Sequence, residues 1–339
     1  MLKAGIIGLG GHGFRHFSAY QQVDGVEVKA VCDFNPESLA KVSAQDCTVR
    51  TFSDWEEMLG EAELDVLSVV TNGPTHAPIV VTASERGLPR IFCEKPFATS
   101  VHDARMMVAV CSENHTRLAV SHGRRWAKSF IELQQLVGSG IVGDPCHFFA
   151  SCGGGLFACN GSHFLDLMCM LSGQKPISIM GFVDEPSRQN PRGKEYHDPG
   201  ALVHIRFDGG MRGTLDMSED LGTPGLVEIM GSMGRIYINE LADEWKIEAR
   251  SPVNKKRSVG EYWLPMESVP FDPHPVDAVE ILTSAIQELI SDDPISCTGV
   301  DGLTSLEMLI GTHVSSELGH IPITLPLAEE YVIRDIPFT

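Results

Sequence analysis

The sequence lacks the features that mark several classes of protein. It has no run of about 18 apolar residues, the length that a helix needs to cross a bilayer. Basic residues are few, with 26 Lys and Arg against 45 Asp and Glu and a net charge of −19. Because such a surface repels phosphates and anionic lipids, we expect neither a nucleic-acid nor a membrane partner. Glycines interrupt the apolar start and no cleavage site follows, which predicts no signal peptide and a cytoplasmic protein.

Paired cysteine spacings are also missing. The cysteines number nine and include no C-x-x-C pair. The sequence therefore predicts neither a zinc site nor a disulfide framework, and we expect no metal. We interpret most of these cysteines as small buried hydrophobic residues.

The chain does have enough length and apolar content for two domains, with 339 residues of which 43% are hydrophobic. Short apolar runs predict strands over 2–7, 26–32, 64–70, 90–93 and 117–121. Helical patterns lie between them, over 36–45, 53–59, 78–86 and 100–114, with Asp54 and Ser100 as candidate N-caps. This alternation predicts an α/β domain with a doubly wound parallel sheet over residues 1–121.

The pattern changes after residue 122. A helix over 128–137 and a second helix beginning near Gly161 precede strands predicted over 177–183, 202–207, 212–217, 226–230, 235–238 and 245–249. Asp208-Gly209-Gly210 predicts a tight hairpin with positive φ at its centre. Residues 252–275 are predicted as a loop, followed by helices over 276–290 and 301–318. We expect a second α/β domain over 122–339 with a large, mostly antiparallel open sheet, whose exposed face needs helices or a second subunit to cover it.

A glycine motif directly follows the first predicted strand. It has the pattern G-x-G-x-x-G and consists of Gly8, Leu9, Gly10, Gly11, His12 and Gly13. The three motif glycines allow a tight turn, a close approach to a pyrophosphate and close helix packing. Asp33 ends the next strand about 20 residues later, where a carboxylate binds an adenosine ribose. A 2′-phosphate would be repelled there, so NAD is favoured over NADP; the alternative is a glycine-rich turn with a solvated Asp.

Polar clusters follow the fourth and fifth predicted strands, at the sheet edge where ligands bind in such folds. Thr71 and Asn72 with His76 form one cluster, and Glu94 with Lys95 forms the other. A lysine at the edge of a cleft can exchange a proton with a substrate hydroxyl. A merely solvated lysine is the alternative.

A third cluster contains a histidine and a carboxylate. His163 and Asp166 are three residues apart at the start of an apolar helix and so share a face. A helix N-terminus favours a neutral imidazole, which can accept a proton. Asp166 could orient this imidazole or bind a substrate hydroxyl. The alternative is a histidine that caps a buried helix. The polar residues 195–198 precede a predicted strand and could also reach the pocket, but they are interpreted as a solvated loop.

Taken together, these motifs resemble the Gfo/Idh/MocA family of glucose-fructose oxidoreductases, inositol dehydrogenases and their relatives over nearly the whole chain. The resemblance rests on the glycine motif with His16, Asp33, Thr71-Asn72 with His76, Glu94-Lys95-Pro96, Arg125, residues 139–143, Gly161-Ser162-His163 with Asp166, Asp301-Gly302 and residues 325–327. It implies an N-terminal Rossmann domain and a C-terminal domain that forms a homodimer or homotetramer through its sheet. It also implies NAD(P)-linked oxidation or reduction of a secondary alcohol of a sugar, inositol or related polyol.

The resemblance also implies roles for individual residues. Lys95 and His163 would be catalytic. The cofactor would contact the glycine motif, Asp33, Thr71, Asn72, His76 and Glu94, and the substrate would contact Arg125, Trp126, Asn160 and Asp166. The alternative for Arg125 is a pair with surface acids, and the alternative for Trp126 is a place in the core. Many relatives carry Asp four residues before the histidine, where this chain has Cys159. Two other functions stay open at this point: a redox-neutral, NAD-dependent hydrolase of the glycosidase type, and a non-catalytic regulator that binds a dinucleotide.

Overall fold

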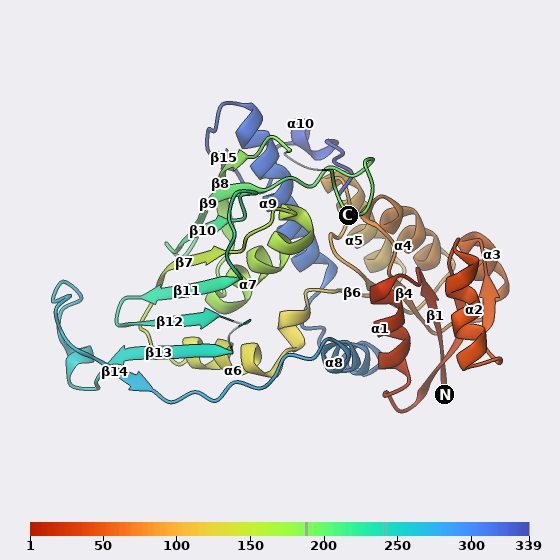
Figure 1. The fold of residues 1–339 in the computed structure, drawn as a ribbon, viewed down its shortest axis with the longest axis horizontal. Helices are drawn as coiled ribbons and strands as arrows, with labels where there is room; N and C mark the ends of the chain where they lie inside the picture. Colours follow the sequence, from red (N-terminus) through yellow and green to blue (C-terminus); the bar gives the residue numbers. More distant parts are fainter. Residues whose placement is uncertain (187–188, 240, 242, 339) are drawn as a thin grey trace. The chain divides into compact units, whose positions relative to one another are not determined.

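The structure, a computed structural model, describes residues 1–186, 189–239, 241 and 243–338 (Figure 1). The chain divides into two compact units, each with its own sheet. The first unit comprises Met1–Trp126, Val276–Leu306 and Ile333–Thr339, and the second comprises Ala127–Pro275 and Glu307–Val332.

The first unit contains a parallel sheet with the strand order β3-β2-β1-β4-β5-β6. Its strands are β1 (Leu2–Ile7), β2 (Val26–Cys32), β3 (Arg50–Phe52), β4 (Val66–Val69), β5 (Arg90–Cys93) and β6 (Arg117–Val120). Its helices are α1 (Gly11–Tyr20), α2 (Pro36–Gln45), α3 (Trp55–Glu61), η1 (Gly73–Thr75), α4 (His76–Glu85), α5 (Val101–Glu113), η2 (Gly123–Trp126) and α8 (Ala278–Ile290). The order reverses at β1, so the ends of β1 and β4 meet where a doubly wound sheet binds its ligands. The predicted parallel sheet is confirmed.

Local capping explains where several of these helices begin. Asp54 accepts a hydrogen bond from the backbone N–H of Glu57 (2.9 Å), and Ser100 accepts one from that of Asp103 (3.0 Å), as predicted. Pro36 stands at the first position of α2, where its missing N–H costs no helical hydrogen bond. Each cap satisfies an N–H group that the first helical turn leaves without a carbonyl partner.

Residues 276–306 differ from the predicted division of the chain. The sequence placed all of 122–339 in a second domain, whereas helix α8 packs on α1 and β5 of the first unit. The apolar stripe of α8, with Leu282, Ile286 and Leu289, is buried in this packing. An amphipathic helix does not indicate by its sequence which of two sheets it will cover.

The second unit contains a nine-stranded sheet with the order β14-β13-β12-β11-β7-β10-β9-β8-β15 (Figure 1). Its strands are β7 (Pro145–Ser151), β8 (Pro176–Val183), β9 (Ala201–Phe207), β10 (Arg212–Asp216), β11 (Leu226–Gly231), β12 (Gly234–Asn239), β13 (Glu244–Arg250), β14 (Met266–Val269) and β15 (Ile323–Thr324). Its helices are α6 (Lys128–Gly138), the π-helical turn η3 (Phe157–Gly161), α7 (Ser162–Ser172), η4 (Asn254–Lys256), α10 (Glu329–Val332) and the later part of α9 (Gly299–Glu317). Since β7 and β10 are the parallel pair, the sheet is mostly antiparallel, as predicted.

One face of this sheet is buried and the other is not. In β9, Val203 and Ile205 are buried whereas His204 and Arg206 are exposed, the alternation of a strand with one covered face. Helix α7 packs on β7 and β10 and contacts α6. Helices therefore cover one face of the sheet.

Some local predictions need correction. The hairpin between β9 and β10 forms as predicted, but the positive φ falls at Gly210. The segment predicted as a loop over 252–275 contains η4 and β14. Strands β3, β7, β14 and β15 were not predicted, because they are very short or mix polar with apolar residues and depend on pairing with their neighbours.

Two global features complete the description. No helix within the described residues is long and apolar enough to cross a membrane. None of the nine cysteines, all of which the structure describes, is disulfide-bonded.

Candidate functional site

The glycine turn after β1 is closed on one side and open on the other. Gly8 has φ +95°, and a Cβ there would lie 2.5 Å from the carbonyl oxygen of Val70. A Cβ at Gly13 would overlap the carbonyl oxygen of Gly8. By contrast, Cβ atoms at Gly10 and Gly11 would have no heavy atom within 4 Å. The turn therefore leaves open space at the start of α1, where backbone N–H groups can bind an anion.

Asp33 lies at this turn. Its Oδ2 accepts a hydrogen bond from the N–H of Leu9 (2.5 Å), and its Oδ1 accepts one from that of Asn35 (2.8 Å). Each carboxylate oxygen has further acceptor capacity for the hydroxyls of a ribose. An open anion site beside a half-exposed carboxylate fits the pyrophosphate and adenosine ribose of a dinucleotide.

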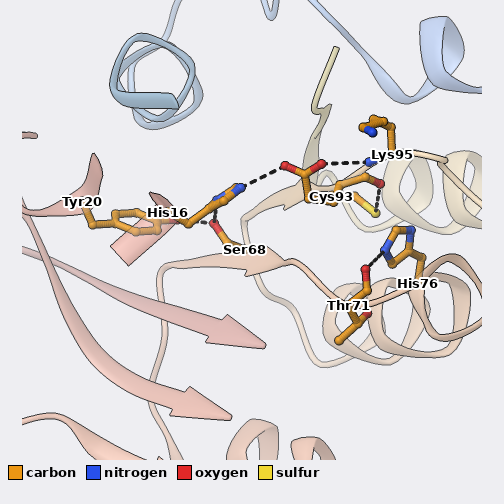
Figure 2. Close-up of polar contacts among 8 residues, drawn as sticks. His16, Tyr20, Ser68, Thr71, His76, Cys93 and Lys95 are labelled. Carbon is orange, nitrogen blue, oxygen red and sulfur yellow. Dashed lines mark hydrogen bonds and ion pairs between the residues drawn. The ribbon is translucent and has the colours of Figure 1, made fainter. Parts of the chain in front are cut away.

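A buried polar network connects α1 to the segment after β5 (Figure 2). The imidazole of His16 lies 3.1 Å from the carboxylate of Glu94 through Nε2 and 3.1 Å from the hydroxyl of Ser68 through Nδ1. The hydroxyl of Tyr20 lies 3.0 Å from that of Ser68. His16 was expected as part of the family motif, but this network was not predicted, because its members come from three separate segments: α1, β4 and the residues after β5.

Burial and charge act in opposite directions on Glu94. Burial raises the pKa of its carboxyl, but the hydrogen bond and charge of His16, with the charges of Lys95 and His12, lower that pKa to about 2. The other carboxylate oxygen accepts a hydrogen bond from the backbone N–H of Lys95 (3.3 Å). The network therefore holds the backbone at Lys95, whose side chain is half-buried.

His76 connects the two polar clusters predicted at the carboxyl ends of β4 and β5. Its ring is fully buried, with Nδ1 3.0 Å from the carbonyl oxygen of Pro96. Its Nε2 lies 3.0 Å from the carbonyl oxygen of Thr71 (Figure 2). Burial lowers the pKa of His76, although these carbonyl groups act in the opposite direction. The structure thus brings the Thr71 and Lys95 segments together through this ring. Cofactor contacts of Thr71, Asn72, His76 and Glu94 stay predictions.

Arg125 and Trp126 have partners within the first unit. The guanidinium of Arg125 donates to the carbonyl oxygen of Ser296 (2.8 Å) and lies 3.0 Å from the carboxylate of Asp301. The indole N–H of Trp126 donates to Glu288 (2.9 Å), and the side chain is buried. These contacts give both residues a structural role, and their contact with substrate stays a prediction.

His163 follows a π-helical turn in the second unit. It is the second residue of α7 and is half-buried, whereas Asn160 in the preceding turn is exposed and Asp166 is 1% exposed. Helical backbone begins at Phe157, earlier than the predicted start near Gly161. π-Helical turns are frequent at functional sites.

A cavity of about 400 Å³ opens beside this turn, within the second unit. Its wall includes Gly154, Leu156, Lys194, Tyr196, Asp198 and Glu219. Asp198, which was interpreted as part of a solvated loop, is 7% exposed and binds the backbone of the turn. That interpretation is wrong for Asp198. The N–H groups that its carboxylate binds lie about 40 residues away in sequence, beyond the range of local patterns. Among the described residues, no group of three or more His, Cys, Asp and Glu is arranged to hold a metal ion.

Family models match both units. A model described as an oxidoreductase family with an NAD-binding Rossmann fold matches residues 2–122. A model of the GFO/IDH/MocA C-terminal domain matches residues 147–237.

Several named dehydrogenases are similar to this chain, two of them over most of its length. A D-apiose dehydrogenase from Paraburkholderia graminis is 25% identical over 94% of this chain and 88% of that protein. A myo-inositol 2-dehydrogenase from Thermotoga maritima is 22% identical over 90% of this chain and 93% of that protein. An inositol 2-dehydrogenase 3 from Saccharopolyspora erythraea is 36% identical over 42% of this chain and 43% of its own.

Solved structures share the fold. An oxidoreductase from Agrobacterium radiobacter in complex with NAD⁺, L-tartaric acid and magnesium has a TM-score of 0.78 at 22% identity, over 95% of this chain and 98% of its own. The WlbA dehydrogenase from Bordetella pertussis, in complex with NADH and UDP-GlcNAcA, has a TM-score of 0.77 at 22% identity, over 96% of this chain and 98% of its own.

Proposed function

Because the chain belongs to the GFO/IDH/MocA oxidoreductase family, we propose that it is an NAD-dependent dehydrogenase acting on a secondary alcohol of a sugar, inositol or related polyol. The observation that carries the proposal is the glycine turn, which is open at Gly10 and Gly11 and lies beside the Asp33 carboxylate. The dehydrogenases named among its relatives support the substrate class.

Residues of the first unit would hold the cofactor. The backbone N–H groups at the start of α1 would bind its pyrophosphate, and Asp33 would accept hydrogen bonds from the ribose hydroxyls. NAD is favoured over NADP because a 2′-phosphate would meet the Asp33 carboxylate, and the residue that follows, Phe34, carries no compensating charge. When bound, NAD would supply the acceptor of the hydride that leaves the carbinol carbon.

Two residues, His163 and Lys95, would act on the reacting hydroxyl of the substrate. His163 would accept the proton of the substrate hydroxyl as the carbon–oxygen double bond forms. The ammonium of Lys95 would stabilise the negative charge that develops on the same oxygen. Asn160, which is exposed beside His163, would bind a further hydroxyl, with Asp166, Arg125 and Trp126 as the other predicted substrate contacts.

The proposal is tested by separating cofactor binding from turnover. NAD binding is measured by calorimetry, and sugars and inositols are screened for the absorbance of reduced nicotinamide. Lys95→Ala and His163→Asn should bind NAD like the wild type but lose turnover by on the order of 100-fold or more. Lys175→Ala, at an exposed position in the second unit, is the matched control.

The outcomes separate the alternatives. Tightly held NAD with bond cleavage and no net NADH would identify the redox-neutral hydrolase instead. NAD binding with no turnover of any substrate would identify the regulator. Unchanged turnover in Lys95→Ala would remove that residue from the mechanism.

We also propose that the chain forms a homodimer or homotetramer through the exposed face of the nine-stranded sheet. Exposed side chains such as His204 and Arg206 lie on this face. Light scattering measures the number of subunits in the wild type and in the double variant His204→Glu/Arg206→Glu. A monomeric wild type would contradict it.

A further inference from the structure

The first N–H groups of the turn before His163 are bound by a distant segment. The first turn of any helix leaves backbone N–H groups without carbonyl partners. Here the N–H of Ala158 donates to Oδ1 of Asp198 (2.6 Å) and that of Cys159 donates to Oδ2 (2.9 Å). The N–H of Phe157 donates to the carbonyl oxygen of Pro199 (3.1 Å). Three successive N–H groups of η3 are thus satisfied by residues 198 and 199.

The segment that contains Asp198 lies shortly before β9, and hydrogen bonds and close packing hold it in place. The carbonyl oxygen of Gly200 accepts a hydrogen bond from the N–H of Asp184 (2.9 Å), directly after β8. The carboxylate of Asp184 in turn accepts one from the N–H of Glu219 (2.7 Å). A Cβ at Gly200 would lie 2.5 Å from that carboxylate and 2.6 Å from the carbonyl oxygen of Met217, so the segment packs tightly.

The chain entering η3 also adopts an uncommon conformation. Leu156 has φ +61° and ψ +55°, a left-handed geometry that costs free energy for a residue with a side chain. Such a conformation persists where surrounding contacts determine it, and the contacts of Asp198 and Pro199 begin at the very next residue. Leu156 and Asp198 both line the cavity beside the turn.

We propose that Asp198 is a positioning residue for His163: its carboxylate fixes η3, and η3 fixes the start of the helix that carries the imidazole. The inference rests on the proposed function, in which His163 accepts the substrate proton. His163 follows Cys159 by about one helical turn, so a shift or rotation of η3 moves the imidazole with it. A carboxylate is suited to this place because it accepts two N–H groups at once and its charge is favourable at a helical N-terminus.

The kinetic test compares Asp198→Asn with Asp208→Asn. The amide oxygen of Asn can accept from one N–H, but its NH₂ group would face the other donor, so η3 loses a hydrogen bond. We expect kcat to fall by on the order of 10-fold to 100-fold with a smaller change in KM, and the pH profile of kcat to shift. NAD affinity should stay unchanged, because the predicted cofactor residues lie in the other unit. Asp208 also accepts a backbone N–H, from Lys175 (3.0 Å), away from the cavity lining, so its variant should match the wild type.

A second variant covers the case in which Asp198→Asn does not fold. Asp198→Glu keeps the charge and both acceptor oxygens but moves them by one methylene, which displaces η3 without removing its partners. A folded Asp198→Glu with a wild-type kcat and pH profile would overturn the inference.

A spectroscopic measurement makes the inference independent of turnover. With histidine side chains labelled for NMR, His163 is assigned by comparison with His163→Asn. Asp198→Asn or Asp198→Glu should shift the His163 imidazole resonance and its titration and should speed hydrogen exchange at Ala158 and Cys159, whereas Asp208→Asn should not. An unchanged His163 resonance would overturn the inference. If Lys95→Ala loses turnover but the Asp198 variants do not, the positioning role of Asp198 fails and the proposed function stands. If the wild type oxidises no substrate, the proposed function fails. The His163 resonance then tests by itself whether Asp198 positions the imidazole.

Discussion

The imidazole Nε2 of His16 lies 3.1 Å from Oε1 of Glu94, and both side chains are buried in the first unit. His16 belongs to α1, directly after the glycine turn, and Glu94 precedes Lys95 at the end of β5. The pair therefore connects the backbone of the candidate cofactor site to the backbone of the candidate catalytic lysine. Because removing one partner leaves the other buried without its hydrogen-bond partner, the pair is sensitive to substitution.

We expect the contribution of Glu94 to stability to disappear in acid. Its pKa falls from 4.5 to about 2 on folding, so between these values the unfolded chain binds more protons and acid favours unfolding. Above pH 4.5 the full contribution, on the order of 3 kcal/mol, is present, and it is lost as the pH falls toward 2. Urea unfolding of the wild type and of Glu94→Gln across this range measures the difference, which should shrink as the pH falls.

Glu61→Gln is the matched control for Glu94. Glu61 pairs with Arg50 on the surface, where both side chains are about half exposed. An exposed pair of this kind contributes about 0–1 kcal/mol, so the variant should be close to the wild type at every pH. A difference between wild type and Glu94→Gln that does not change with pH would contradict the role given to the charge of Glu94.

Gly10→Ala should weaken NAD binding without destabilising the fold. Gly10 has φ −68°, which suits alanine, and its Cβ would meet no heavy atom within 4 Å. The methyl group would project into the space proposed for the pyrophosphate, and we expect the Kd for NAD to rise about 10-fold or more, or about 1.4 kcal/mol. Calorimetric titration and thermal unfolding of the same sample measure both effects. Unchanged NAD affinity would argue against a pyrophosphate at this turn.

Gly13→Ala should destabilise the first unit. Its Cβ would overlap the carbonyl oxygen of Gly8, and a backbone atom cannot move aside as the end of a side chain can. We expect a loss of about 1–3 kcal/mol in the free energy of unfolding, measured in urea. Gly10→Ala, in the same turn, provides the control. Equal stability of the two variants would show that α1 can move away from the turn at little cost.

Asp33→Asn should reduce NAD affinity and the preference for NAD over NADP. A hydrogen bond to a charged group contributes about 1.5–3 kcal/mol, which predicts a Kd for NAD about 10-fold to 100-fold higher. The affinity for NADP should fall less, because the repulsion of its 2′-phosphate is removed as well. Asp46→Asn is the control, since Asp46 also accepts hydrogen bonds, from Thr48 (2.6 and 2.9 Å), on an exposed turn. A constant ratio of the two affinities would mean that Asp33 does not distinguish the cofactors.

Where a structural element depends on neighbours in sequence, it could be predicted closely. The bounds of β1, β2, α2 and β5 agree with the prediction. Continuous apolar runs identify the strands, and a proline at the first position identifies the start of α2. The glycine turn is equally local, because steric contacts within a few residues require its spacing.

Elements that depend on distant partners were missed. Strand β3 has three residues and forms by pairing with β2, and β7 mixes His, Cys and Ser with Phe before it pairs with β10 and β11. A polar residue followed by proline and glycine, just before an alternating strand, was the available signal for Asp198. That signal indicates a turn, and it does not identify the N–H groups that the carboxylate will bind.

The amino-acid sequence by itself determined the two kinds of sheet and the glycine turn with its acidic neighbour, since periodicity and short spacings encode these features. The candidate pair Lys95 and His163 came from the resemblance of the sequence motifs to a known family. Only the tertiary structure decided that His16 binds Glu94, that Trp126 is buried against Glu288 and that Asp198 holds the turn before His163. The physical reason is that hydrogen bonds and burial depend on which groups the fold brings together, and those groups here are between 39 and 162 residues apart.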